Sequence, residues 1–452
     1  MRYLLLIFLT SCTLGPHFYK PDVETPSKWT ASQDPLTSWW ESFEDPLLTE
    51  LIEESLISNA DLQIAQMRLC KARLERKKAL SARWPRLGLN FDAARIDLSD
   101  DFPLIASNQH FDFFEAGFDA TWEVDLFGKM RRGKEALDAL VGIEEEKLHM
   151  TQLSLIVEIA RNYFDLCHAQ NQIALIEELL LLQVSLYEDM LLLKNEELSG
   201  NGPNIEIAQE IEKMESKLSQ MQTEAQLIKN RLAFLVNGLP GSLDQKLQGF
   251  HLLPHCPTPT IGLPSTLLCR RPDIRLAEQM LALQIAEVGI SMSNFLPKFD
   301  LLGNIGTLST ILPRLFQSQT YTDLFNFLAK VPLFEGGKLV AQLKIAKTEE
   351  QEALLNYTKA ALGAFHEVDA ALMQYEERRL KVALLTSFME RGAKLVENAL
   401  LLEKEELASH TLVKQQKIKY IESKSEYLRA KAGLLEQALS LYKSLGGGWE
   451  LY

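Results

Sequence analysis

The sequence has few cysteines, no block of basic residues and, after its first dozen residues, no long apolar run. No later window approaches the roughly 20 apolar residues that a spanning helix needs, which excludes a helical membrane protein. The net charge is −14, and without a Lys/Arg cluster the chain lacks the phosphate neutralisation on which nucleic-acid affinity mainly rests. Intrinsic disorder is excluded as well, because 46% of the residues are hydrophobic.

Catalytic motifs are also absent from the sequence. It contains no G-x-S-x-G, no H-E-x-x-H and no phosphate-binding glycine loop, so we predict neither a catalytic residue nor a cofactor. The length of 452 residues alone predicts about two to four domains.

The cysteines show no C-x-x-C pair. Two alternatives stay open for Cys256, which lies in a proline-rich stretch: a disulfide with Cys269, or a metal site with His251 and His255. Cys70 and Cys167 fall in helical patterns and are interpreted as small buried apolar residues. The cysteines after the first dozen residues are Cys70, Cys167, Cys256 and Cys269.

The first twelve residues have the pattern of an export signal. A charged start at Arg2 precedes a short apolar stretch and then Leu9-Thr10-Ser11-Cys12, which resembles a bacterial lipoprotein box. Cys12 is therefore predicted to carry a lipid and to begin the mature chain at a membrane surface. Thr13, and not Asp, follows it, which in lipoprotein sorting favours the outer membrane. The alternative is an ordinary signal with an incidental cysteine.

The chain contains an internal duplication. Asp61 precedes Pro85 by 24 residues, and Asp273 precedes Pro297 by the same interval, within similar text. Each proline is followed by two alternating segments and then by long helical patterns. We predict a repeat of helix, strand, strand, long helix and helix, with a period of about half the mature chain.

The predicted helices are too long for a compact core, since seventy residues would reach about 100 Å. One of them carries apolar seams on two faces, which favours a wall of helices with a partner on each side; a fully buried bundle helix is the alternative. The helices are expected at 45–83, 129–198, 205–235, 273–295, 338–407 and 412–445. The first seam is Leu153, Ile156, Ala160, Tyr163 and Cys167, and the second is Leu155, Ile159, Leu166 and Ile173.

The segment 111–126 alternates with a period of two over more than the 9–11 residues of a membrane-crossing strand. Its even positions from 114 to 124, such as Phe118 and Trp122, are apolar, whereas the odd positions include four carboxylates. Other strands are expected at 87–91, at 299–303 and before 331–337. Four strands cannot close a barrel alone, and unpaired edges in lipid cost several kcal/mol per group, so three chains giving about twelve strands are expected. A globular sandwich with its acidic face in water is the alternative.

Seven motifs in order resemble the outer membrane factor family, and within it the TolC-related lipoproteins that serve resistance-nodulation-division drug efflux pumps. The motifs are Cys12 with Gly15-Pro16 and Lys20-Pro21, Trp39-Trp40, Phe43-Glu44-Asp45-Pro46-Leu47, Trp122-Glu123-Val124-Asp125-Leu126-Phe127-Gly128, Leu268-Cys269-Arg270-Arg271-Pro272-Asp273-Ile274, Pro332-Leu333-Phe334-Glu335-Gly336-Gly337 and Leu441-Tyr442-Lys443-Ser444-Leu445-Gly446-Gly447-Gly448-Trp449.

This resemblance implies a mainly α-helical homotrimer with a membrane β-barrel. Four strands per protomer would close a twelve-stranded barrel in the outer membrane, and a long α-helical barrel would cross the periplasm. The expected parts are a signal peptide (1–11), a lipid-anchored equatorial segment (12–44), repeat 1 (45–237), an equatorial Pro/Gly-rich joint (238–271), repeat 2 (272–445) and a tail (446–452). The residues expected to line the barrel lumen are Glu115, Asp119, Glu123 and Asp125.

The resemblance also implies two periplasmic tips, the turns at 199–204 and 406–411, which meet an adaptor protein. Related channels carry an acidic residue at the entrance constriction where this chain has Gln415, beside the basic Lys414. Such a ring of amides and lysines would attract cations less; a one-turn alignment slip is the alternative. In the second tip Glu406 or a neighbour replaces an expected glycine. The first tip contributes Gly200, Asn201, Gly202 and Glu206.

The predicted function is a passive exit duct for drugs or other small amphiphilic compounds, fed by a periplasmic adaptor and an inner-membrane pump. A channel for protein secretion or metal-ion export would have the same fold. A lipid-anchored periplasmic adaptor or structural coiled-coil lipoprotein would share Cys12 and the long helices, but would lack paired amphipathic strands in both halves.

Overall fold

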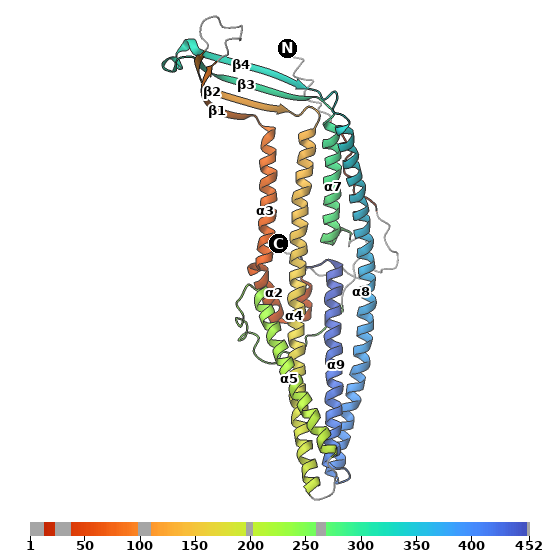
Figure 1. The fold of residues 1–452 in the computed structure, drawn as a ribbon. Helices are drawn as coiled ribbons and strands as arrows, with labels where there is room; N and C mark the ends of the chain where they lie inside the picture. The colour runs from red at the N-terminus through yellow and green to blue at the C-terminus, as the bar shows by residue number, and fades with distance from the viewer. Residues whose placement is uncertain (1–12, 23–37, 98–109, 196–201, 259–267, 450–452) are drawn as a thin grey trace. The chain divides into compact units, whose positions relative to one another are not determined.

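The computed structural model describes residues 13–22, 38–97, 110–195, 202–258 and 268–449. These residues form long helices and one four-stranded sheet (Figure 1). Cys12 lies outside the described residues. The chain divides into two compact units, and each unit draws on both halves of the sequence. Unit 1 comprises residues 1–22, 67–145 and 276–358, and unit 2 comprises residues 23–66, 146–275 and 359–452.

Each half contains a helix, two strands, a long helix and a shorter helix in this order. The first half contains the 3-10 helix η1 (Trp39–Phe43), α2 (Pro46–Ser58), α3 (Ala60–Leu80), η2 (Ser81–Arg83), β1 (Arg86–Asp97), β2 (His110–Val124), α4 (Lys129–Asn195) and α5 (Gly202–Leu235). The second half contains α7 (Pro272–Ser293), β3 (Lys298–Ser309), η3 (Leu312–Arg314), η4 (Ser318–Thr320), β4 (Tyr321–Lys330), α8 (Lys338–Lys404) and α9 (His410–Leu445). The two longest helices, α4 and α8, have 67 residues each.

The first predicted helix, 45–83, is wrong as a single element because the chain breaks at Asn59. Asp45 caps α2 by accepting hydrogen bonds from the backbone N–H groups of the next turn, and Pro46 occupies the first helical position. Asn59 then has an extended backbone. Its Oδ1 accepts from Leu62 N at 3.1 Å, which begins α3, while its Nδ2 donates to Leu235 O at 2.8 Å.

The sheet has the order β1-β2-β3-β4, with every neighbouring pair antiparallel. β2 matches the segment predicted from its alternation to within two residues at each end. β1 and β3 are longer than predicted, with 12 residues each. β4 ends at Lys330, directly before the stretch 331–337 at which the fourth strand is expected to close.

The core of unit 2 contains a cluster of aromatic residues from η1, α4 and α9. Trp39 stacks on Tyr442 with ring centroids 4.9 Å apart, and Phe43 packs against Phe164 at 5.1 Å. Both predicted seams of α4 contribute to this core, and all of their residues are buried except Ile173, which packs against it. Both faces of this stretch of α4 are therefore covered within the chain, as the wall of helices and the buried bundle helix both expect.

Among the described residues, no helix is both long enough and apolar enough to cross a membrane.

Candidate channel surfaces

One face of the sheet in unit 1 is apolar and open. The strand register places Leu89, Phe118 and Ile305 side by side across β1, β2 and β3, and Leu301 beside Phe327 across β3 and β4. Their alternate spacing puts all of them on one face. The large exposed side chains of this face are Leu87, Leu89, Phe91, Phe118, Trp122, Leu301, Ile305, Phe325 and Phe327.

The opposite face carries three of the four predicted lumen carboxylates. Glu115, Asp119 and Glu123 occupy alternate positions of β2 and therefore point to the same side. Glu115 Oε1 accepts a hydrogen bond from Asn304 Nδ2 at 3.3 Å, and Asp119 lies across from Gly88 of β1. One face is thus apolar and the other acidic, although a role in a lumen stays a prediction.

Asp125 is not part of this acidic face. It lies one residue beyond Val124, the last residue of β2, and its Oδ2 accepts a hydrogen bond from Arg131 N at 3.1 Å. The Arg131 side chain lies 3.6 Å from the same carboxylate. The prediction that groups Asp125 with the strand carboxylates is therefore corrected: this residue connects the end of the strand to the start of α4.

The second predicted tip, in unit 2, is a short turn with a defined backbone. Glu406 adopts a left-handed conformation, with φ of 60°. Leu407 N donates to Leu402 O at 2.8 Å and Glu406 N to Glu403 O at 2.9 Å, which is the Schellman arrangement that normally places glycine at the Glu406 position. This motif ends α8 three residues before the predicted 407.

The start of α9 completes this turn. Ser409 caps the helix by accepting a hydrogen bond from Leu412 N at 3.2 Å. His410 Nδ1 lies 2.5 Å from Glu403 Oε1, so a side-chain contact joins the two helices across the turn.

Lys414 is buried and paired, contrary to the predicted ring of free lysines. Only 9% of its side chain is exposed, and its Nζ lies 2.6 Å from Asp189 Oδ2. The ammonium also donates to Ser185 Oγ at 2.6 Å and to Ser185 O at 3.2 Å. The Lys414 ammonium therefore connects α9 to α4 through an ion pair and hydrogen bonds. Gln415, the next residue, is exposed, as is Glu206 on α5.

The first predicted tip lies mostly outside the described residues, including Gly200 and Asn201. Gly202 is the first residue of α5, which therefore begins three residues before the predicted 205.

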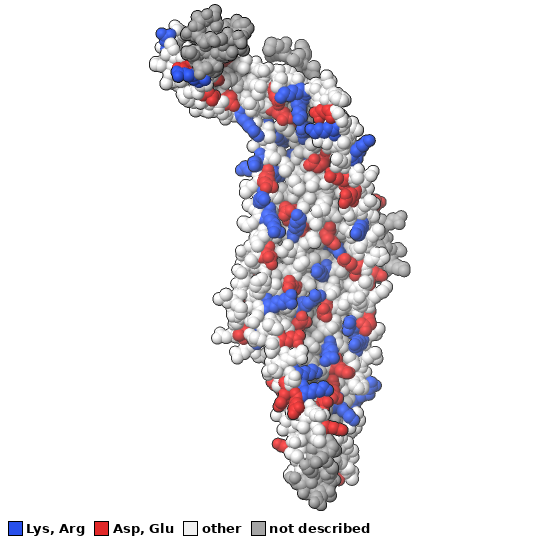
Figure 2. Space-filling view, in the orientation of Figure 1, with Lys and Arg blue, Asp and Glu red and all other residues white. Residues whose placement is uncertain are grey.

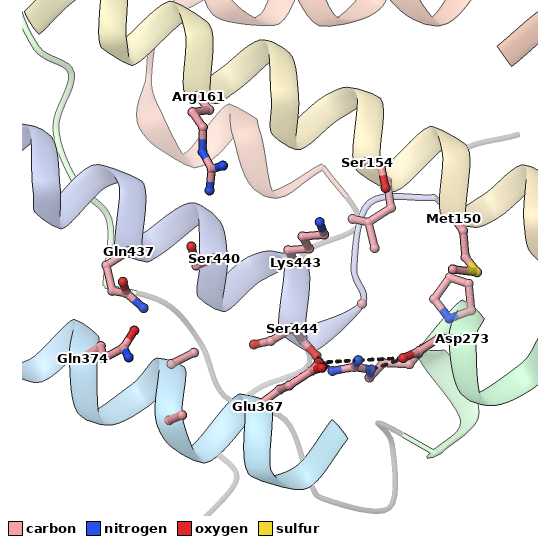
Figure 3. A pocket seen from close by; sticks show the side chains of 16 residues that line it. Met150, Ser154, Arg161, Asp273, Glu367, Gln374, Gln437, Ser440, Lys443 and Ser444 are labelled. Carbon is pink, nitrogen blue, oxygen red and sulfur yellow. Dashed lines mark hydrogen bonds and ion pairs between the residues drawn. The ribbon is translucent and has the colours of Figure 1, made fainter. Parts of the chain in front are cut away.

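A pocket of ≈ 530 Å³ lies among α4, α7, α8 and α9 in unit 2 (Figure 3). Arg271 is buried at its end, where Nη1 donates to Ser444 O at 2.8 Å and Nη2 lies 2.7 Å from both Asp273 Oδ2 and Glu367 Oε2. Figure 3 shows Arg161 of α4 and Glu367 of α8 on different walls. The guanidinium therefore joins α7, α8 and the end of α9.

A second cluster in unit 2 holds the C-terminal segment. Trp449 stacks on His149 with ring centroids 4.3 Å apart, and the Arg275 guanidinium lies 4.8 Å from the Trp449 ring. Arg275 Nη2 and His149 Nδ1 also contact the buried Glu146, at 2.7 Å and 3.1 Å. Ring stacking and a cation–π contact thus hold Trp449 against α4 and α7, and Glu146 fixes the two side chains that make these contacts.

Neither alternative for Cys256 is supported. The four cysteines that the structure describes are free, which excludes the predicted pairing of Cys256 with Cys269. Within the described ranges, no group of three His, Cys, Asp or Glu residues could hold a metal ion, so His251, His255 and Cys256 form no such site.

Comparison with known proteins decides the family. The model of the outer membrane efflux protein family matches residues 51–182 and 263–447. The chain belongs to the outer membrane efflux protein family. It is thus an efflux channel of the outer membrane.

Several relatives align with this outer membrane efflux protein over almost their entire length. The cation efflux system protein CusC of Escherichia coli O6:H1 strain CFT073 is 26% identical over 474 residues, covering 100% of this chain and 98% of the relative. The solvent efflux pump outer membrane protein SrpC of Pseudomonas putida is 26% identical over 468 residues, covering 99% and 97%. The solved outer-membrane channel OprN superposes with a TM-score of 0.85 at 28% identity, covering 97% of this chain and 100% of that one.

The sequence of this outer membrane efflux protein does not reveal which distant residues pair with its buried Arg271 and Lys414. Arg271 was part of a motif, but nothing near it in sequence points to Glu367 or Ser444. Lys414 was singled out, but its partner Asp189 was not. A signal exists for Lys414, because a lysine on the apolar face of a helix requires a buried counter-charge.

Proposed function

We propose that this channel is the outer membrane component of a tripartite efflux system and functions as a homotrimer. In this proposal, three four-stranded sheets close a twelve-stranded barrel, a lipid on Cys12 anchors each chain, and the long helices form a duct into the periplasm. The duct is passive, and a periplasmic adaptor and an inner-membrane pump deliver small amphiphilic compounds to it.

The open sheet of unit 1 is the observation that carries this proposal. β1 and β4 are the outer strands, and each has one edge without a partner strand among the described residues. The apolar face beside these edges is exposed, with Phe325 at 74%. A sheet of this kind in lipid requires further strands, because unpaired backbone groups there cost several kcal/mol each. Copies of the same chain supply such strands with closed symmetry.

An exposed apolar stripe on the C-terminal half of α8 supports oligomerisation independently. Met373, Leu380 and Leu384 are spaced by seven and four residues and lie on one helix face, where they are exposed, Leu384 to 71%. Leu372 and the same three residues line a shallow groove with Glu376, Glu377 and Lys381. An apolar stripe of this length on a helix is typical of a face that another helix covers.

The charged surface agrees with an aqueous environment for the helices. Figure 2 shows acidic and basic side chains interspersed along them on the face in view. This face of the helices is therefore suited to contact with water.

The test is extraction of the Cys12→Ser variant from membranes. Without its lipid, a trimeric channel still requires detergent and elutes at the mass of three chains in light-scattering chromatography. Release of the variant into buffer as a monomer would contradict the channel assembly and favour the lipid-anchored adaptor.

Cargo is tested in cells that lack their own outer membrane efflux channel. Expression of this chain with its adaptor and pump is expected to restore tolerance to amphiphilic dyes and solvents. Cation export is the second candidate, because the similar CusC is a cation efflux protein and the sheet carries an acidic face. Restored tolerance to metal cations without tolerance to dyes would favour this second candidate.

A further inference from the structure

The described N-terminal segment, residues 13–22, is part of unit 1 and is held there at three places. Nearest to Cys12, the Arg132 side chain binds Leu14 and Gly15. Further along, Phe18 packs against an apolar cluster that includes Leu281 of α7. Lys20 Nζ then lies 2.7 Å from Glu278 Oε2.

Arg132 is the strongest of these attachments. Only 1% of it is exposed, yet it carries a permanent charge. Nε donates to Leu14 O at 2.8 Å and Nη2 to Gly15 O at 2.8 Å, while Nη1 lies 2.6 Å from Glu135 Oε2. Two of the three nitrogens therefore depend on backbone carbonyls of the segment. Removing the segment would leave a buried guanidinium without these acceptors, which is strongly unfavourable.

Three glycines shape the space around this contact. A Cβ on Gly15, whose φ is +94°, would come within 2.7 Å of Gly289 Cα. A Cβ on Gly289 would lie 2.8 Å from Arg132 Cδ and Nε, and a Cβ on Gly128 would lie 2.7 Å from Thr13 Cγ2. Any larger residue at these positions would displace the segment or the arginine. We call Arg132, Gly128 and Gly289 the N-terminal socket.

The socket places the segment at one end of the sheet. Thr13 contacts Gly128, which lies four residues beyond Val124, the last residue of β2. Thr13, the residue after Cys12 in the sequence, is therefore fixed at this end. β3 begins and β4 ends at the same end of the sheet, since Lys298 pairs with Lys330.

An apolar notch of ≈ 370 Å³ opens on the sheet near this end. Trp122, Leu301 and Phe327 lie two to three residues from the ends of their strands. Gly303 has no side chain and leaves space beside the Phe325 ring, 3.6 Å from where a Cβ would stand. The Trp122 indole is fixed because its Nε1 donates to Arg83 O at 3.0 Å. The notch is therefore a preformed apolar depression on the exposed face.

We propose that the N-terminal socket holds the residues after Cys12 so that an acyl chain on Cys12 binds in the notch of the same chain. The ligand class is a saturated acyl chain, and its source is the chain's own lipid and not a free membrane lipid. This inference rests on the lipidation of Cys12 in the proposed function. The socket would thereby set the depth at which the anchor enters the membrane relative to the strands.

The experiment uses cells fed with a photoactivatable palmitate, which the lipidation machinery attaches to Cys12 of the full chain. After irradiation of the membranes, cross-linked peptides are identified by mass spectrometry. The expected product joins the N-terminal peptide to strand peptides that contain Trp122 or Phe325. Mixing isotope-labelled and unlabelled chains is expected to give products within one chain, without mixed pairs.

Gly15→Ala tests the socket, because it changes a residue of the segment and none of the helices. The yield of the strand product is expected to fall roughly tenfold, as a positive-φ alanine and its contact with Gly289 disfavour the docked state. The matched control is Gly133→Ala, since nothing lies within 4 Å of a Cβ at Gly133. An unchanged yield in Gly15→Ala would overturn the role of the socket.

The other outcomes separate this inference from its premise. An N-terminal peptide that carries the photolipid but cross-links only to free lipid, or to another copy, overturns the notch and leaves lipidation intact. An N-terminal peptide without photolipid overturns both the notch and the lipid anchor, while the trimer measured by light scattering still tests the channel.

Discussion

At the scale of single residues, the pair of Lys414 and Asp189 predicts an asymmetric response to mutation. Asp189→Ala leaves a buried ammonium with only the two Ser185 oxygens, so we expect a loss of about 2 kcal/mol of stability. Lys414→Met leaves Asp189, which is partly exposed and can be hydrated, so a loss of about 1 kcal/mol is expected. Denaturation of the helices, followed by circular dichroism at one protein concentration, measures both.

Lys213→Met is the matched control for Lys414→Met. Lys213 lies 3.3 Å from Glu210, but 76% of its side chain is exposed, so its removal is expected to change stability little. Equal effects of the two Lys→Met changes would contradict a buried cross-link.

In bilayer recordings, Gln415→Ala is expected to alter single-channel conductance little, and a several-fold increase would place Gln415 in the constriction after all.

Two buried thiols predict how stability depends on pH in the alkaline range. Burial raises the pKa of the Cys256 thiol to about 11 and that of the Cys167 thiol to about 12, from an ordinary value of 9.0. Because both folded pKa values lie above the unfolded value, this stability is complete below pH 9 and is lost as the pH rises through 11 and 12. By pH 10.5 we expect a loss of about 1–2 kcal/mol from each thiol.

The double variant Cys167→Ala, Cys256→Ala isolates this contribution. Its urea midpoint is expected to fall less steeply between pH 8.5 and pH 10.5 than that of the unmodified chain. Tyr375 also has a raised pKa because of burial, so some alkaline loss remains in the variant. Parallel curves for the two proteins would contradict a raised pKa at both cysteines.

At the scale of elements, the end of α8 stores strain that a single substitution relieves. Glu406 occupies the left-handed position of the Schellman motif, where a side chain costs about 1–2 kcal/mol relative to glycine. Glycine loses more entropy on folding, by about 0.5–1 kcal/mol. Glu406→Gly is therefore expected to stabilise the chain by about 0.5–1 kcal/mol, measured as a higher denaturation midpoint.

Glu405→Gly is the control for this change, because the backbone φ of Glu405 is not positive. It is expected to destabilise the chain slightly. A gain of stability in both variants would indicate that loss of a carboxylate at the tip, and not relief of backbone strain, causes the effect.

The sequence predicts elements well where a local pattern decides them and poorly where a distant partner does. β2 is placed accurately because its alternation runs without a break from Phe114 to Val124, whereas β4 has adjacent apolar pairs such as Leu324-Phe325 that hide its period. The break at Asn59 depends on Leu235 O, 176 residues away. Likewise, the burial of Lys414 depends on Asp189, 225 residues away, so neither could be read from its neighbours.

At the scale of the whole molecule, the two halves of the sequence are interleaved. Unit 1 contains the sheet with parts of α3, α4, α7 and α8, and unit 2 contains the tip turn, the pocket and the aromatic core. Each half therefore contributes two strands to the sheet and helices to both units. A single repeat would leave β2 or β3 with an additional open edge, so neither half is expected to fold alone.

The unpaired edges of β1 and β4 lead to a test of how many copies close the sheet. In a ring of copies, β1 of one chain pairs with β4 of the next, so cysteines on the polar faces of these strands should cross-link between chains. We would combine Asn90→Cys with Thr322→Cys, Leu324→Cys or Asn326→Cys in turn, since the closing register is set by the tilt of the strands.

Under mild oxidation, at least one of these pairs is expected to give a ladder on denaturing gels that ends at three chains. Either cysteine alone should give no such ladder, because each junction between chains then carries a single cysteine. The two cysteines cannot pair within one chain, since β2 and β3 lie between β1 and β4. Bands beyond three chains would mean that the sheets stack as an open filament or a larger ring. Only monomers from all three pairs would mean that the edges remain open, which the cost of unpaired backbone in lipid forbids for a membrane barrel.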